Sequence, residues 1–125
     1  MSIKVLVVDD EVNFAEMLVK RLRSRNFDAL AASDGPSALA TMHSLEPDVV
    51  ILDVRMPGMD GHEMLGRIRT AHPAVKVIML TAHGSIDDAV TDLRRGAFNY
   101  LQKPCSITDL IEAVQQAAQP TEESR

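Results

Sequence analysis

The chain has 125 residues, of which 46% are hydrophobic and 25% charged, and this is the size of a single domain with one apolar core. Thirteen basic and eighteen acidic side chains give a net charge of −5, so the field of the domain would repel nucleic acid and anionic membrane surfaces. The one cysteine, Cys105, cannot form an internal disulfide, and we see neither a signal-peptide pattern nor an apolar run of membrane-spanning length. We therefore expect a soluble, cytoplasmic domain.

Short β-branched apolar runs alternate with amphipathic patterns along the chain. In chain order these predict a strand over 3–8, a helix over 15–22, a strand over 27–31, a helix over 36–43, a strand over 49–52, a helix over 61–71, a strand over 75–80, a helix over 86–93, a strand over 98–101 and a helix over 107–114. The runs are mostly continuous rather than alternating in hydrophobicity, which is typical of parallel strands covered on both faces. Five strand–helix repeats therefore predict one α/β domain with helices on both faces of a parallel sheet.

The domain is expected to occupy residues 1–119, followed by a polar C-terminal tail at residues 120–125. The tail contains Pro120 and no apolar stripe, which is typical of a frayed end. Ser106 and Asp109, three residues apart, resemble a capping box at the start of the last helix. No internal repeat or low-complexity segment divides the chain, so we expect no second domain within it.

Polar side chains follow four of the five predicted strands. Asp9 and Asp10 follow the first strand, Asp53 the third, Thr81 the fourth and Lys103 the fifth. Ligands of open parallel sheets bind outside the carboxyl ends of the strands. We therefore expect these side chains to meet and form a site.

Three carboxylates against one ammonium group leave an excess of negative charge at this edge. A like-charged pair at about 4 Å costs on the order of 4 kcal/mol near a protein surface. A divalent cation would offset this repulsion, and oxygen ligands without Cys or paired His favour Mg²⁺. A carboxylate beside Mg²⁺ and a lysine can attack phosphorus to form an acyl phosphate, to which the hydroxyl of Thr81 could donate a hydrogen bond.

Four segments together resemble the receiver domain of bacterial two-component response regulators. They are Val7–Glu11, Leu52–Gly61, Leu80–Ala82 and Tyr100–Pro104. Each segment is short, but all four occur in order at predicted strand ends, and the resemblance extends from Ile3 to about Ala118. Residues 81–85 and 96–100 are most similar to receivers of transcriptional regulators.

The resemblance implies a flavodoxin-like (βα)5 three-layer sandwich, with a parallel five-stranded sheet in the order 2-1-3-4-5. It implies that Asp53 is the phosphoacceptor. Mg²⁺ would be bound by Asp10, by Asp53 and by the backbone carbonyl of Arg55, and Asp9 would act through a bound water. Lys103 would pair with the phosphoryl oxygens.

The resemblance also implies a cis peptide between Lys103 and Pro104 and a switch formed by Thr81 and Tyr100. On phosphorylation Thr81 would move towards the phosphoryl group and Tyr100 would turn inward. The surface of the fourth helix, fifth strand and fifth helix would then change and favour an effector, a partner protein or a second copy. His83 and Met56 would lie at the rim of the site, and the positions of His83 and Arg55 influence phosphoryl lifetime in the family.

The function that follows is a phosphorylation-dependent switch, with a sensor histidine kinase or a phosphotransfer protein as donor and transcription as the regulated process. Such a domain is not an enzyme beyond catalysing its own phosphorylation and dephosphorylation. One alternative is a receiver-like interaction module that is never phosphorylated. Another is a Mg²⁺-dependent phosphohydrolase, which needs an acid where the chain has Arg55. Nucleotide or flavin binding is excluded because Asp9, Asp10 and Glu11 would repel phosphate after the first strand.

The remaining polar residues carry weaker predictions. The four histidines lack a pair at metal-ligand spacing, so surface or capping roles are expected for His43, His62 and His72. Cys105 is expected to be an inert, half-buried thiol.

Overall fold

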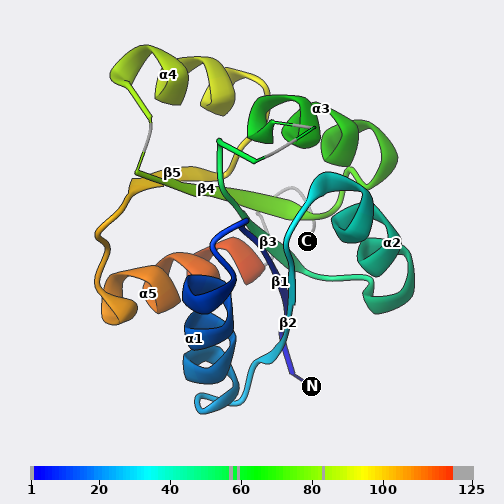
Figure 1. The fold of residues 1–125 in the computed structure, drawn as a ribbon, viewed down its shortest axis with the longest axis vertical. Helices are drawn as coiled ribbons and strands as arrows, with labels where there is room; N and C mark the ends of the chain where they lie inside the picture. The colour runs from blue at the N-terminus through cyan, green and yellow to red at the C-terminus, as the bar shows by residue number, and fades with distance from the viewer. Residues whose placement is uncertain (1, 57, 59, 83, 120–125) are drawn as a thin grey trace.

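The computed structural model describes residues 2–56, 58, 60–82 and 84–119. Its five strands form one parallel sheet between two layers of helices (Figure 1). The elements are β1 (Lys4–Val8), α1 (Val12–Arg23), β2 (Asp28–Ala32), α2 (Gly35–Leu45), β3 (Val49–Leu52), α3 (Gly61–Ala71), β4 (Lys76–Thr81), α4 (Ile86–Arg94), β5 (Asn99–Gln102) and α5 (Ile107–Ala118). The strand order is β2-β1-β3-β4-β5, which confirms the predicted flavodoxin-like fold. The proposed tail at 120–125 lies outside the described residues.

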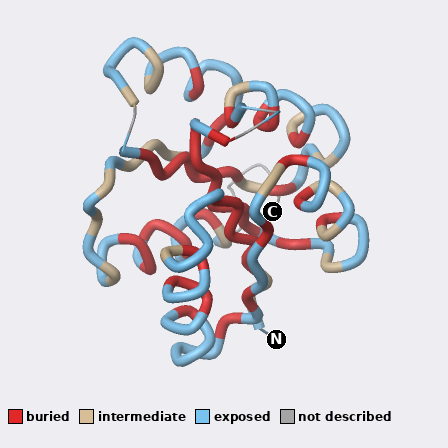
Figure 2. The backbone as a smooth tube through the Cα atoms, viewed as in Figure 1, coloured by how far each residue is buried: buried red, intermediate tan, exposed pale blue. Residues whose placement is uncertain are grey.

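Two apolar cores lie on the two faces of the sheet. Successive side chains of a strand point to opposite faces, so Val5 and Val7 pack with α1 and α5. Leu6 and Val8 pack on the other face, with α2 and α3. In Figure 2 the buried residues accordingly run through the strands and along the inner sides of these helices. Burial on both faces explains why the strand sequences are continuous rather than alternating in hydrophobicity.

Most element boundaries lie within one or two residues of those predicted. β2 begins at Asp28 rather than at Phe27, because the Phe27 N–H donates to the Leu22 carbonyl at the end of α1 and its side chain joins the core beneath that helix. The predicted cap of α5 is present, since the Asp109 N–H donates to the Ser106 hydroxyl at 3.0 Å. Local sequence signals therefore predict the ends of these strands and helices closely.

The fourth helix differs from the expectation for an amphipathic pattern. Ile86, Val90 and Leu93 supply the apolar stripe that predicts α4, yet their exposed fractions are 83%, 43% and 45%. The stripe of α4 therefore faces outward instead of packing on the sheet. Within the described residues no helix is long and apolar enough to cross a membrane.

Candidate functional site

The strand ends bring four predicted site residues to one edge of the sheet. Asp9 follows β1, Asp53 follows β3, Thr81 ends β4 and Lys103 follows β5. The strand hydrogen bonds continue past these ends, since the Asp53 N–H donates to the Val8 carbonyl at 3.0 Å and the Lys103 N–H to the Thr81 carbonyl at 3.0 Å. The sheet backbone thus holds these residues in register.

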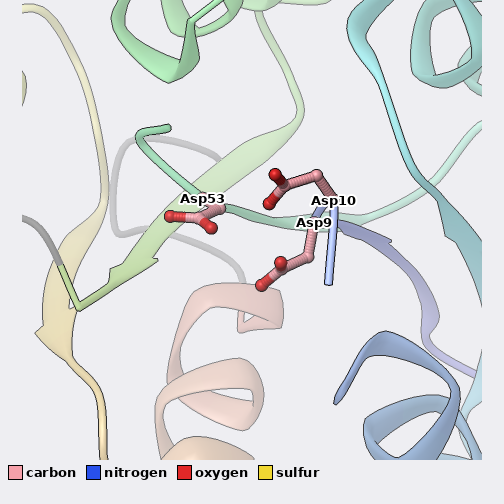
Figure 3. Close-up of side chains that lie close together, drawn as sticks. All are labelled: Asp9, Asp10 and Asp53. Atoms are coloured by element: carbon pink, nitrogen blue, oxygen red, sulfur yellow. The ribbon is translucent and has the colours of Figure 1, made fainter. Parts of the chain in front are cut away.

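Asp9, Asp10 and Asp53 form a compact cluster of carboxylates (Figure 3). One oxygen of each lies within 4.8 Å of the others. Asp9 and Asp53 are each 3% exposed, whereas Asp10 is exposed. Carboxylates buried this close together repel one another, so the site requires compensating positive charge.

Lys103 supplies positive charge to the carboxylate cluster. Its Nζ is 2.7 Å from Oδ2 of Asp9, 3.2 Å from Oε1 of Glu11 and 3.8 Å from Oδ2 of Asp53. The ammonium group also contacts the ring of Phe14, with Nζ 4.2 Å from the ring centroid. Burial alone would lower the pKa of Lys103, but the hydrogen bond and charge of Asp9, followed by the other two carboxylates, raise it above 10.5. Lys103 is therefore a cation held closer to Asp9 than to Asp53.

The ionisation of Asp9 opposes folding. Burial raises the pKa of Asp9 above its usual value of 3.8, and this outweighs the hydrogen bonds from Lys103 and from the Glu11 N–H, which lower it. Between 3.8 and the higher pKa of the folded state, the folded protein keeps a proton that the unfolded chain releases. The free energy of unfolding therefore falls as the pH rises through this window.

Replacing Asp9 by Asn is expected to remove this pH-dependent loss of stability. Relative to the wild type, the Asp9→Asn variant gains free energy of unfolding as the pH rises from about 4 towards neutrality. Urea unfolding at a series of pH values, in EDTA to exclude metal binding, measures the difference. Asp28→Asn, at the exposed start of β2, is the matched control for the loss of a carboxylate outside the cluster. A pH-independent difference for Asp9→Asn contradicts this account.

Three further residues, Arg55, Met56 and His83, were predicted to lie next to Asp53 or at the rim of the site. The Arg55 N–H lies 3.4 Å from Oδ1 of Asp53, so the chain after β3 turns around the carboxylate. Met56, expected at the rim, is instead 8% exposed and packs in the core with α2 and α3, where its apolar side chain gains more from burial. His83, the other expected rim residue, lies outside the described residues.

The predicted switch residues lie on two neighbouring strands, Thr81 at the end of β4 and Tyr100 in the outer strand β5. Thr81 is fully buried at the end of β4. The hydroxyl of Tyr100 is buried and, among the described residues, has no hydrogen-bond partner. Its ring lies against Gly84, where a Cβ would overlap the hydroxyl, so the inward position of Tyr100 requires glycine there. The peptide bond between Lys103 and Pro104 is cis.

Two partners of Lys103 were not predicted. Glu11 stands in the acidic segment after β1, and that placement was the available signal for its contact with the lysine. Phe14 offers no comparable signal, because its contact with Lys103 depends on the tertiary packing of α1 against the sheet. Cys105 is half-buried, and burial, with a contribution from the charge of Asp109, raises the pKa of its thiol above 9.0, as expected for an inert cysteine.

The prediction for His62 is wrong. Instead of a surface or capping role, its Nδ1 lies 2.7 Å from Oδ1 of Asp92, a fully buried carboxylate on α4. Asp92 was not singled out from the sequence, because it stands within an ordinary run of helical polar residues. This contact joins the start of α3 to α4.

The carboxylate cluster fits a hard divalent cation such as Mg²⁺. In the described part of the chain the cluster offers oxygen donors from Asp9, Asp10 and Asp53, and neither Cys nor His belongs to it. Two of its carboxylates are almost fully buried, so a cation would offset their repulsion. The exposed carboxylate of Asp10 leaves one side open to solvent.

The chain matches a known family and curated relatives over most of its length. Residues 5–115 match the family model of the response regulator receiver domain. The chain is 39% identical over 109 residues to the probable transcriptional regulatory protein TcrX of Mycobacterium tuberculosis, which covers 87% of this chain and 47% of TcrX. It is 39% identical over 113 residues to the DNA-binding transcriptional regulator NtrC of Salmonella typhimurium, covering 90% of this chain and 24% of NtrC.

Solved structures of isolated receiver domains are similar over nearly their whole length. A response regulator receiver domain from Clostridium thermocellum has a TM-score of 0.87 and 35% identity, covering 93% of this chain and 94% of that one. The receiver domain of NtrX from Brucella abortus has a TM-score of 0.87 and 34% identity, covering 94% of this chain and 99% of that one.

This chain belongs to the response regulator receiver domain family. Its homologues are two-component response regulators of transcription, and phosphorylation and Mg²⁺ are typical of the family. The chain spans about half the length of TcrX and about a quarter of NtrC.

Proposed function

We propose that Asp53 accepts a phosphoryl group from a sensor histidine kinase or a phosphotransfer protein, and that the domain thereby switches an output in transcription regulation. The observation that carries this proposal is the buried carboxylate of Asp53, placed beside Asp9, Asp10 and Lys103 at the carboxyl edge of the sheet. Burying a carboxylate at the end of an apolar strand costs free energy and adds nothing to an apolar core. Buried ionisable groups cluster at functional sites, which favours a reactive role for Asp53.

In the proposed reaction a carboxylate oxygen of Asp53 attacks the phosphorus of a phosphohistidine. The O–P bond forms, the N–P bond breaks, and the leaving imidazole takes up a proton from solvent. Lys103 is already 3.8 Å from Asp53 and can reach the new phosphoryl oxygens by leaving Asp9 and Glu11. The hydroxyl of Thr81 would donate a hydrogen bond to the same group.

Asp10, Asp53 and the backbone carbonyl of Arg55 would hold Mg²⁺, with Asp9 acting through a water. When bound, the ion supplies positive charge that stabilises the transferring phosphoryl group. The residues of the chain provide the remaining elements of the site: a nucleophile, a cationic side chain and a buried hydroxyl.

Mg²⁺ is expected to stabilise the wild type and to have little effect on an Asp10→Asn variant. At a free concentration tenfold above its dissociation constant, the ion adds about 1.4 kcal/mol to the free energy of unfolding. This corresponds to a rise in Tm of about 5 °C for a domain of this size. Calorimetry with and without Mg²⁺ measures the shift, with Asp28→Asn as a control that keeps it. A full shift in Asp10→Asn would exclude Asp10 as a ligand.

The output surface proposed is that of α4, β5 and α5. This surface includes three exposed apolar residues of α4, namely Ile86, Val90 and Leu93. An effector domain, a partner protein or a second copy could cover this apolar area. Thr81 and Tyr100 would connect phosphorylation to this surface. Binding of nucleic acid by this domain itself is not proposed, because its net charge is −5.

Incubation with acetyl phosphate, followed by intact-mass measurement, tests the proposed function. With Mg²⁺ the wild type should gain the mass of one phosphoryl group, and without Mg²⁺ it should not. A chain that stays unmodified under both conditions favours an interaction module that is never phosphorylated. Continuous release of phosphate from many phosphate esters would favour a phosphohydrolase, which the exposed Arg55 at the position of the second acid argues against.

A further inference from the structure

Helix α4 is held to the domain in an unusual way. All nine of its residues are described, and among them Asp92 alone is buried. By contrast, α1 buries Ala15, Leu18, Val19 and Leu22. The large apolar residues of α4, which are Ile86, Val90 and Leu93, are exposed, and Figure 2 shows the helix mostly exposed. Hydrophobic burial, which fixes the other helices, therefore contributes little to the position of α4.

The contact between Asp92 and His62 is the evident anchor for this helix. Nδ1 of His62, in the first turn of α3, is 2.7 Å from Oδ1 of Asp92. The side chain of Asp92 is 0% exposed and that of His62 is 26% exposed. Oδ2 of Asp92 has no hydrogen-bond partner among the described residues. A buried carboxylate with one oxygen unpaired is costly, so Asp92 stays inside because His62 binds its other oxygen.

The anchor lies next to the predicted switch. Gly84, two residues before α4, contacts the ring of Tyr100, so a shift of the helix start changes the space available to that ring. Burial raises the pKa of Tyr100 above 10.0, and the charges of Asp88 and Asp92 add to this effect, which places α4 carboxylates close to the phenol. The position of α4 and the position of Tyr100 are therefore linked through this short segment.

We propose that the His62–Asp92 contact is a positioning pair that holds α4 against α3 while Tyr100 is in its inward position, and that its strength sets how stable this arrangement is when the domain is phosphorylated. The second half of the proposal rests on the proposed function. Breaking the contact removes part of the preference for this position of α4. A phosphoryl mimic, which is expected to favour the inward position of Tyr100, should then bind more weakly.

Hydrogen exchange tests the anchor without any phosphorylation. In His62→Leu, amides of α4 should exchange about tenfold faster than in the wild type, while those of α1 stay unchanged. His62→Asn keeps an N–H donor near the position of Nδ1 and should exchange within about threefold of the wild type. His43→Leu, at an exposed histidine of α2, controls for loss of an imidazole. Unchanged α4 exchange in His62→Leu would overturn the proposal.

A second variant tests the same contact if His62→Leu fails to fold. Asp92→Ala removes both carboxylate oxygens and with them the contact, and alanine tolerates burial in a helix, so it should still speed α4 exchange relative to α1. Equal rates in Asp92→Ala and the wild type would again overturn the anchor.

Beryllofluoride, used with Mg²⁺ as a phosphoryl mimic, tests the coupling. His62→Leu or, if that variant is unfolded, Asp92→Ala should bind it about three- to tenfold more weakly than the wild type, and His62→Asn should bind like the wild type. Faster α4 exchange with unchanged or tighter beryllofluoride affinity would overturn the coupling. If the wild type itself binds no beryllofluoride, the proposed function fails, while faster exchange in the variants still supports the anchor.

Discussion

Asp53→Asn is expected to abolish the phosphoryl adduct formed with acetyl phosphate and Mg²⁺. The amide has almost the size of the carboxylate, so it can occupy the same place after β3, but it is a far weaker nucleophile. The adduct should fall from one per chain to below detection by intact mass. The fold should persist, since the change removes one of the two buried carboxylates that repel each other beside Lys103.

The control for this variant is Asp28→Asn, at the exposed start of β2 on the opposite edge of the sheet. It should be phosphorylated to the same extent as the wild type. Retention of the adduct in Asp53→Asn would show that another residue accepts the phosphoryl group. The short distances to Asp9 and Asp10 make those two carboxylates the first to examine.

Gly61→Ala is expected to damage both stability and the site. Gly61 is the first residue of α3, and its N–H donates to the Val54 carbonyl at 2.6 Å. A Cβ at this position would overlap the carbonyl oxygen of Asp53 and lie 2.6 Å from Cα of Val54. Both obstacles are backbone, so the helix or the segment after β3 must move. We expect a loss of about 3 kcal/mol in the free energy of unfolding.

Gly66→Ala on the same helix is the matched control. Nothing lies within 4 Å of a Cβ at Gly66, and the residue is exposed. Alanine should therefore stabilise α3 by about 0.5–1 kcal/mol through its higher helix propensity. Urea unfolding measures both effects, and phosphorylation should be impaired only in Gly61→Ala. Equal stability of the two variants would contradict the close packing of α3 on the Asp53 backbone.

The features that the sequence predicted well are those controlled by local patterns. Apolar runs locate the strands because both sheet faces are covered, and polar residues at their ends meet because parallel strands share one carboxyl edge. The cap at Ser106 follows from three neighbouring residues. Asp9, Asp53 and Lys103 come together for the same reason of topology, although they are far apart in the sequence.

The features that escaped prediction depend on tertiary packing. Periodicity predicts that α4 is amphipathic but cannot say which way its apolar stripe faces, and here Ile86 and its neighbours face outward. The contact of His62 with Asp92 joins residues that are 30 positions apart on two helices. The Nζ of Lys103 lies closer to the carboxylates of Asp9 and Glu11 than to that of Asp53, and this depends on side-chain geometry within the site.

The central claim is that Asp53 itself carries the phosphoryl group, and locating the modified residue tests it most directly. After reaction with acetyl phosphate and Mg²⁺, borohydride reduces an acyl phosphate of aspartate to homoserine. Trypsin then releases residues 26–55 as one peptide, because no Lys or Arg lies between Arg25 and Arg55. Tandem mass spectrometry should find homoserine at position 53 and unmodified aspartate at Asp28, Asp34 and Asp48. Homoserine at another position, or none in the Mg²⁺-treated protein, would contradict the account.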